Sequence, residues 1–273
     1  MNYVNTVEVA KDESEAPFWS MNDVCHLKSF DTALLRTQQL IRSRQGWGLI
    51  LGDAGSGKTA LAHSLRRCLS RDDSFIFHSI ASPEFKSEFQ FLLHLVKLFK
   101  VVPHFKSTLD FKEALKTSLL ESSIAQHKTV VLLIDQAHLL SLNNLEVLRT
   151  LVHYKKGGIK LLQLVTLAQI DILSRIKRIP HLSEGIALKY TLNPLDERET
   201  REMIEFRLTR AGSNIQRSHL TDEAFGFAYQ YTKGLPGSIT EFCEVAAKAI
   251  AHHRADTVDA RMLGTFFPGM HEA

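Results

Sequence analysis

The run from Leu49 to Thr59, LILGDAGSGKT, constrains the fold of this chain more than any other segment. An apolar stretch leads directly into Gly-x-x-x-x-Gly-Lys-Thr, and a helical pattern follows it. Glycines there let the backbone turn its N–H groups toward an anion, and the amino end of the next helix adds its dipole at the same place. The segment therefore predicts a phosphate-binding P-loop between a strand and a helix.

Side chains within this loop have predicted parts in binding a nucleoside triphosphate. Lys58 is expected to reach the β- and γ-phosphates, and the hydroxyl group of Thr59 is expected to hold Mg²⁺. Backbone N–H groups of the loop are expected to supply the remaining phosphate contacts. The predicted nucleotide-binding positions are Gly52, Asp53, Ala54, Gly55, Ser56, Gly57, Lys58, Thr59 and Ala60.

A second apolar run, Thr129 to Ile134, ends in Asp135. A buried parallel strand places a following carboxylate at the carboxyl edge of its sheet, where ligands of such sheets bind. The carboxylate of Asp135 is expected to coordinate Mg²⁺ or to accept a hydrogen bond from water bound to the ion. Thr59 and Asp135 are therefore the predicted metal-binding residues.

Apolar strands alternate with helices through the first two thirds of the chain, which predicts a parallel sheet covered by helices on both faces. Beyond Pro194 the pattern predicts helices only, as in a small lid over the nucleotide. The predicted strands cover 47–51, 74–80 as a buried strand, 129–134, 159–167 and 186–192. The predicted helices cover 30–45, the P-loop helix to 69, 82–100 with Ser82 as N-cap and Pro83 in the first turn, 111–126, 196–211, 221–231 capped by Thr221, 236–253 and 258–266.

This α/β pattern predicts three parts: an N-terminal arm over 1–26, a nucleotide-binding domain over 27–193 and a helical lid over 194–273. The chain has 273 residues and lacks both an apolar run of about 20 residues and a signal-peptide core, so a cytoplasmic protein without a membrane span is expected. Its three cysteines, Cys25, Cys68 and Cys243, are scattered and fit reduced thiols. Its net charge of +3 permits contact with nucleic acid without arguing for it.

The chain resembles the AAA+ ATPases of the ExeA/GspA secretion-accessory type, whose relatives include the TnsC, TniB and MuB transposition ATPases. This resemblance implies ATP as the nucleotide, Mg²⁺ as the metal ion, a sheet with strand order 5-1-4-3-2, a helical lid, and assembly into a ring or filament. The matching segments are Pro17-Phe18, Ser82-Pro83-Glu84, Ile134 to Leu139, Leu162 to Val165 with Gln169, Tyr190 to Leu195, Glu199-Thr200, Arg207-Leu208 to Gly212, and Gly234-Leu235-Pro236.

The chain departs from this family where hydrolysis is concerned. The strand that ends in Asp135 matches the family's Walker B motif. In the family a Glu that activates the attacking water follows the Walker B Asp, and this chain has Gln136 there. A glutamine orients water but does not accept its proton, and loss of a general base costs about 10²–10⁴ in rate. Lys58, Asp135, Gln136 and Gln169 are the predicted catalytic residues of a weak ATPase. Glu146, on the following helix, is an alternative base.

Two arginines that the family places near the γ-phosphate are also missing. Gly185 stands where a finger arginine is expected, and Gly237 stands where an arginine commonly follows the lid's Gly-Ile-Pro. Arginine fingers are worth about 10³–10⁵ in turnover, so slow or absent hydrolysis is predicted. Arg175 or Arg178 is an alternative finger from slightly upstream, which would leave turnover normal.

Three functions are compatible with these features. The first is an oligomeric, nucleotide-dependent switch that acts on a protein partner. The second is a DNA-binding filament that recruits a transposase or a similar machine, and the third is a regulator that only signals nucleotide occupancy. The cations considered for DNA contact are Arg66-Arg67, the loop Lys155-Lys156-Gly157-Gly158, Arg175, Lys177 and Arg178.

Overall fold

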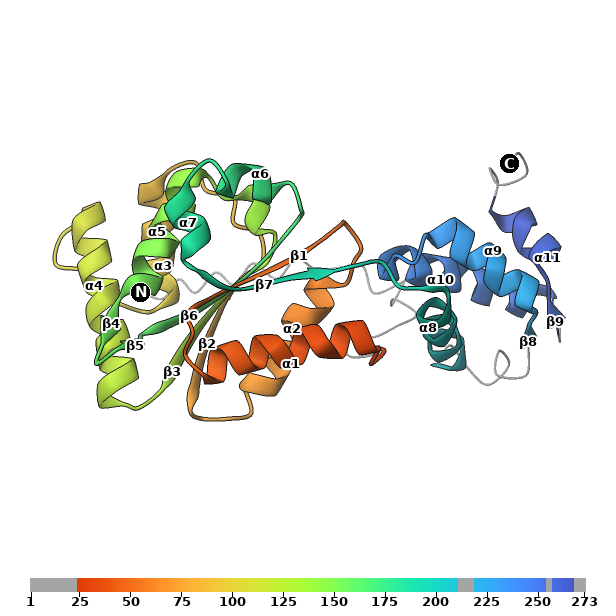
Figure 1. Ribbon diagram of the computed structural model, residues 1–273, viewed down its shortest axis with the longest axis horizontal. Helices are drawn as coiled ribbons and strands as arrows, with labels where there is room; N and C mark the ends of the chain where they lie inside the picture. Colours follow the sequence, from red (N-terminus) through yellow and green to blue (C-terminus); the bar gives the residue numbers. More distant parts are fainter. Residues whose placement is uncertain (1–23, 211–218, 254–256, 268–273) are drawn as a thin grey trace, which may run out of the picture.

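The computed structural model describes residues 24–210, 219–253 and 257–267, which form a parallel sheet joined to a group of helices (Figure 1). The sheet has the order β2-β3-β6-β1-β7, and every neighbouring pair is parallel. Numbered among themselves, the five strands run 2-3-4-1-5, which confirms the order implied by the family resemblance. The strands are β1 (Trp47–Gly52), β2 (Phe75–Ile80), β3 (Thr129–Ile134), β6 (Leu162–Ala168) and β7 (Ile186–Leu192).

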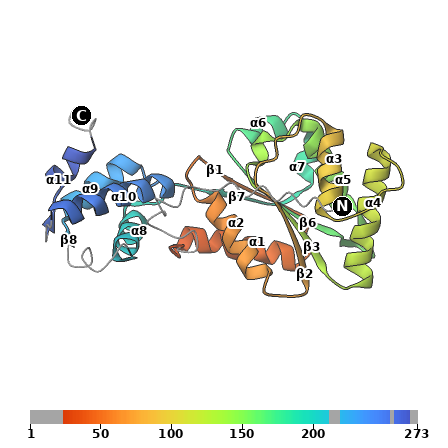
Figure 2. The same cartoon turned by 180° about the vertical axis from the view of Figure 1, so that it is seen from behind.

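Helices cover both faces of this sheet, which explains why β1, β3 and β6 are buried along their whole length. Alternate side chains of a strand point to opposite faces, so Leu132 packs into one apolar cluster, and Val131 and Leu133 pack into the other. Figures 1 and 2 show the two layers of helices on either side of the sheet. The first layer contains α1 (Lys28–Arg42) and α2 (Lys58–Leu69), and the second contains α3 (Glu88–Leu98), α4 (Thr108–Leu120) and α5 (Leu142–His153).

Two expectations for the segment between the first and third strands are wrong. Strand β2 lies at the sheet edge next to β3 alone, so only Ile80 of its six residues is buried. The helix predicted to start at Ser82 and Pro83 begins instead at Glu88. The hydroxyl group of Ser87 caps this helix by accepting a hydrogen bond from the backbone N–H of Gln90 at 3.2 Å.

The segment predicted as a loop followed by one strand over 159–167 contains a separate hairpin. Strand β4 (Lys155–Lys156) pairs antiparallel with β5 (Ile159–Lys160), and β6 begins only at Leu162. Gly157 and Gly158 connect the pair with φ angles of 60° and 81°. A two-residue turn of this kind needs positive φ at both positions, which glycine adopts without strain.

Several other element boundaries also differ from the prediction. The helix predicted over 111–126 begins at Thr108 and ends in a π-helical turn, Glu121–Ala125. Two short helices, α6 (Ile172–Ile176) and α7 (Pro180–Glu184), connect β6 with β7.

The C-terminal helices pack around an apolar cluster of their own, which includes Ile204, Phe242 and Leu263. The predicted N-cap is confirmed, because the hydroxyl group of Thr221 accepts a hydrogen bond from the N–H of Ala224 at 3.2 Å. The expectation of helices only is wrong, because two short strands pair beside them. The elements are α8 (Glu197–Arg210), β8 (His219–Leu220), α9 (Asp222–Thr232), α10 (Pro236–His253), β9 (Thr257–Val258) and α11 (Ala260–Phe266).

Some predictions fall outside the described residues or are not tested by them. The Pro17-Phe18 pair, most of the N-terminal arm and the loop over 212–214 lie outside the described ranges. The division of the chain at 193/194 stays a prediction. Within the described part of the chain, no helix combines the length and the apolar character that crossing a bilayer requires.

Candidate functional site

The P-loop leaves the carboxyl end of β1 and leads into α2 at Lys58. Gly55 and Gly57 have φ angles of 75° and 93°, in the region that side chains disfavour. No side chain caps the start of α2. Since the first N–H groups of a helix have no partner within it, this helix start can receive an anion.

The ammonium group of Lys58 is held inside the loop. It donates hydrogen bonds to the backbone oxygens of Gly52 at 2.8 Å and Asp53 at 2.6 Å, and it lies 3.3 Å from the hydroxyl oxygen of Ser56. Only 8% of Lys58 is exposed, and this burial lowers the pKa of its ammonium group. The carboxylates of Asp135 and Asp53 act in the opposite direction. The buried ammonium group of Lys58 is therefore held by backbone oxygens directly beside the turn that can bind an anion.

The two predicted metal-binding residues are in direct contact. The hydroxyl group of Thr59 donates a hydrogen bond to one carboxylate oxygen of Asp135 at 2.8 Å. The other oxygen accepts a hydrogen bond from the backbone N–H of Gln136, also at 2.8 Å, and Asp135 is 7% exposed. A hydroxyl and a carboxylate oxygen are ligands that suit Mg²⁺, so the donor set fits the ion.

Gln136 follows Asp135 with a left-handed backbone, φ 51° and ψ 37°, and its side chain is exposed. Backbone strain of this kind is common in functional loops. The neighbouring loop contributes Gln169, whose backbone N–H lies 3.4 Å from the Nδ1 atom of His138. The loops after β3 and β6 are thus joined at the carboxyl edge of the sheet through His138, a residue that no motif in the sequence singled out.

The basic and acidic groups considered as substitutes for missing catalytic residues are engaged within the chain. The guanidinium group of Arg175 donates to the backbone oxygens of His138, at 2.5 Å, and Leu140. The carboxylate of Glu146 pairs with Arg149 at 2.8 Å and with His181 at 2.9 Å. Arg175 therefore braces the loop that carries Gln136, and Arg149 pairs with Glu146.

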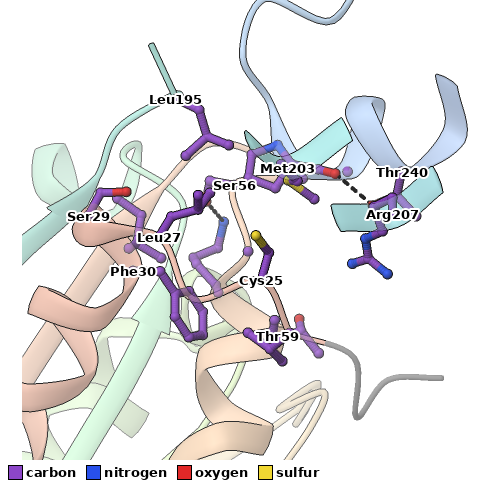
Figure 3. A pocket seen from close by; sticks show the side chains of 18 of the residues that line it. Cys25, Leu27, Ser29, Phe30, Ser56, Thr59, Leu195, Met203, Arg207 and Thr240 are labelled. Atoms are coloured by element: carbon purple, nitrogen blue, oxygen red, sulfur yellow. Dashed lines mark hydrogen bonds between the residues drawn. The ribbon is translucent and has the colours of Figure 1, made fainter. Parts of the chain in front are cut away.

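A cavity of about 530 Å³ adjoins the P-loop (Figure 3). Its volume is within the usual range for small-molecule and cofactor sites. Three parts of the chain form its walls: the segment before α1 with the first turn of that helix, the P-loop with the start of α2, and the end of β7 with its following linker and helices α8 and α10. Residues that the sequence did not single out for this site include Cys25, Leu27, Phe30, Leu195, Met203 and Thr240. The cavity thus joins an anion-binding end to a mainly apolar end.

The lid helices touch the P-loop through two glycines. The backbone N–H of Gly237 donates a hydrogen bond to the backbone oxygen of Gly55 at 2.8 Å. A methyl group at Gly237 would lie 3.0 Å from the Cα atom of Gly55, so this close approach needs glycine. Gly185, the other position where the family has an arginine, lies against α5, since an added Cβ would be 3.5 Å from the ring of His153.

Comparisons with known proteins agree with this geometry. A family model described as an AAA domain matches residues 41–176, about half of the chain. The general secretion pathway protein A of Aeromonas hydrophila is 26% identical over 214 residues, which are 77% of this chain and 38% of that protein. The chain belongs to the ExeA-like AAA+ proteins. It spans well under half the length of this curated relative.

Solved structures share the fold at low sequence identity. The ORC2 protein of Aeropyrum pernix has a TM-score of 0.62 at 15% identity, over 93% of this chain and 69% of its own. Cdc6p from Pyrobaculum aerophilum has a TM-score of 0.66 at 14% identity, over 88% and 67%. RuvB of Thermotoga maritima has a TM-score of 0.59 at 16% identity, over 89% and 68%. The AAA+ architecture, a P-loop sheet followed by helices, is thereby confirmed.

Proposed function

We propose that this protein binds ATP with Mg²⁺ and uses the bound nucleotide to fix a conformation or an assembly of several copies, with slow hydrolysis. The main support for this proposal is the contact between Thr59 and Asp135, which lies beside the buried ammonium group of Lys58. Lys58 would turn from its backbone partners to the phosphates, and Thr59 and Asp135 would hold the ion. Bound Mg²⁺ neutralises charge on the phosphate oxygens.

The surroundings of the phosphates support slow turnover. Gln136 offers no proton acceptor for an attacking water, and glycines stand at both positions where the family has arginines. The alternatives in the same chain are engaged elsewhere, because Arg175 donates to backbone oxygens and Glu146 pairs with Arg149 and lies 2.9 Å from the ring of His181. Assembly into a ring or filament and action on a protein partner are what the family resemblance implies, and they form part of the proposal, as does the division into 1–26, 27–193 and 194–273.

The proposal is tested by measuring nucleotide affinity, turnover and molecular mass on the same preparation. We expect ATP binding that Lys58→Ala lowers at least 100-fold, a mass that rises with ATP and Mg²⁺, and turnover well below the usual enzymatic range of about 1–10³ per second. Unchanged affinity in Lys58→Ala would remove the site assignment. Turnover within the usual range would overturn the switch with slow hydrolysis.

DNA binding is the second candidate, and the structure changes which residues favour it. Arg66-Arg67 end α2 on one face of the sheet, whereas α6 packs on the other face, and Arg175 is engaged internally. These cations therefore do not form one surface together with Lys177 and Arg178. The hairpin lysines are the remaining observation in favour of this candidate.

A further inference from the structure

Cations gather at the amino edge of the sheet, opposite the end that carries the P-loop. Parallel strands all start at this edge, so the segments that precede β1, β3 and β6 meet there. Each of these segments contributes basic side chains, and α4 adds one more. We call this group the basic edge: Arg44, Lys116, Lys128, Lys155, Lys156 and Lys160.

Contacts between these segments make the group contiguous. The ammonium group of Lys160 donates to the backbone oxygen of Gln45 at 2.9 Å, which joins the hairpin to the residue after Arg44. The guanidinium group of Arg44 donates to the backbone oxygen of Lys128 at 3.2 Å. On the other side of the hairpin, the ammonium group of Lys116 lies 5.7 Å from the centre of the Tyr154 ring.

These six cations have no ion-pair partner within the described part of the chain, although Glu113 lies one turn before Lys116 on α4. None of the six cations lies within 4 Å of a carboxylate there, although six ion pairs of Lys or Arg with carboxylates occur elsewhere in those ranges. Lys155 stands directly opposite Lys160 in the hairpin, an arrangement of like charges that destabilises a strand pair. Burial and, next, the charge of Lys155 lower the pKa of Lys160. Lys155 and Lys156 are the exposed members of this group, whereas Arg44, Lys116, Lys128 and Lys160 are half-buried.

We propose that the basic edge binds the phosphodiester backbone of a nucleic acid, without reading its sequence. Phosphate contacts require little more than positioned Lys and Arg side chains. A protein partner fits less well, because five of the six cations are lysines, and lysine is depleted at protein interfaces. The hairpin exposes a single large apolar side chain, Ile159, at 43%. This inference is independent of the nucleotide site, which lies at the opposite edge.

The test compares two double charge reversals in the full chain, measured with a fluorescent 20-base-pair DNA duplex of arbitrary sequence in the absence of nucleotide. Lys155→Glu with Lys156→Glu alters the hairpin (Figure 1, lower left). Lys177→Glu with Arg178→Glu is the matched control, because both residues are exposed and follow α6 at the top of the same view. Each pair removes two positive charges and adds two negative ones, so the net charge changes from +3 to −1 in both (3 − 4).

We expect the hairpin variant to bind at least tenfold more weakly and the control to change less than twofold. The slope of the logarithm of affinity against the logarithm of salt concentration should fall by about 2 in the hairpin variant, since each phosphate contact contributes about 0.9. No duplex binding at 50 mM salt would overturn the proposal. An equal loss in both variants would overturn it too, because net charge alone would then explain the effect.

Two further measurements test whether the surface binds an acidic protein segment instead and whether the hairpin variant is folded. If polyglutamate binds the full chain as tightly as DNA does and loses affinity in the same variant, the surface serves an acidic protein segment and the proposal is overturned. ATP affinity measured on the hairpin variant should equal that of the unaltered chain, which also shows that the variant is folded. A failure of DNA binding with intact ATP binding therefore leaves the proposed nucleotide switch standing.

Discussion

In the proposed function, the side chain that follows Asp135 limits hydrolysis of the bound nucleotide. Because Gln136 cannot accept a proton, Gln136→Glu should raise turnover, by at least about tenfold given the usual worth of a general base. The left-handed backbone at this position tolerates Glu about as well as Gln, since neither is β-branched. Phosphate release measures the effect, and Gln136→Ala is the control that should not rise.

Unchanged turnover in Gln136→Glu would mean that the missing arginines, and not the missing base, limit hydrolysis. That result would contradict the hypothesis that Gln136 is the cause of slow hydrolysis. It would direct attention to Gly185 and Gly237, where this chain has no side chain to offer a γ-phosphate.

The contact of Gly237 with Gly55 makes a second prediction about single residues. In Gly237→Ala the new methyl group would lie 3.0 Å from a backbone carbon, so the lid must shift and strain the hydrogen bond to the P-loop. Loss of one such bond is worth about 0.5–1.5 kcal/mol, so ATP affinity should fall roughly 2- to 10-fold. Gly226→Ala is the matched control, because a Cβ there meets nothing within 4 Å in the middle of α9. Equal affinities in the two variants would contradict a role for the glycine contact in nucleotide binding.

At the scale of elements, the sequence predicted features that depend on local residue patterns. It did not predict features that depend on how elements pack against one another. The P-loop and the strand before Asp135 were predictable because continuous apolar runs and glycine spacing are local signals. The exposure of β2 was not, because a strand's position at the sheet edge depends on the other strands. The start of α3 was misplaced because Ser82 and Ser87 are both good N-caps, and the sequence alone does not choose between them.

The cavity walls were missed for the same reason. Leu27, Met203 and Thr240 come together only when the segment before α1 and the lid helices pack beside the P-loop. Their spacing along the chain carries no signal of this, whereas the Thr59–Asp135 contact could be expected from two recognised motifs.

Arg175 provides a prediction for the loops at the carboxyl edge of the sheet. Its guanidinium group joins α6 to two backbone oxygens of the loop after β3, and hydrogen bonds with a charged donor contribute about 1.5–3 kcal/mol. Arg175→Ala should therefore lower the free energy of unfolding by about 2 kcal/mol in urea denaturation. Arg178→Ala, an exposed change three residues away, should stay within about 0.5 kcal/mol. Similar losses in both variants would show that Arg175 does not brace the loop.

At the scale of the whole molecule, the packing of three distant parts of the chain forms the cavity beside the P-loop. The segment of Cys25, the P-loop and the lid helices each supply a wall, so a bound nucleotide would hold all three together. The three cysteines report on this arrangement because their surroundings differ. Cys68 is exposed, Cys25 is half-buried at the cavity wall, and Cys243 is buried in the apolar cluster of the C-terminal helices.

Alkylation of these thiols should follow that order and respond to ATP at one position. Burial raises the pKa of Cys25 to about 11 and that of Cys243 to about 12. Because the thiolate is the reactive form, Cys25 should react slowly near pH 8, and its rate should rise about tenfold per pH unit until the pH approaches 11. ATP with Mg²⁺ should slow Cys25 further by covering the cavity, while Cys68 keeps its rate and serves as the internal control. Mass spectrometry of alkylated peptides measures all three sites at once. An unchanged rate at Cys25 under saturating ATP would show that the nucleotide does not reach the wall formed by the segment before α1, and the three-part cavity would then not be the nucleotide site.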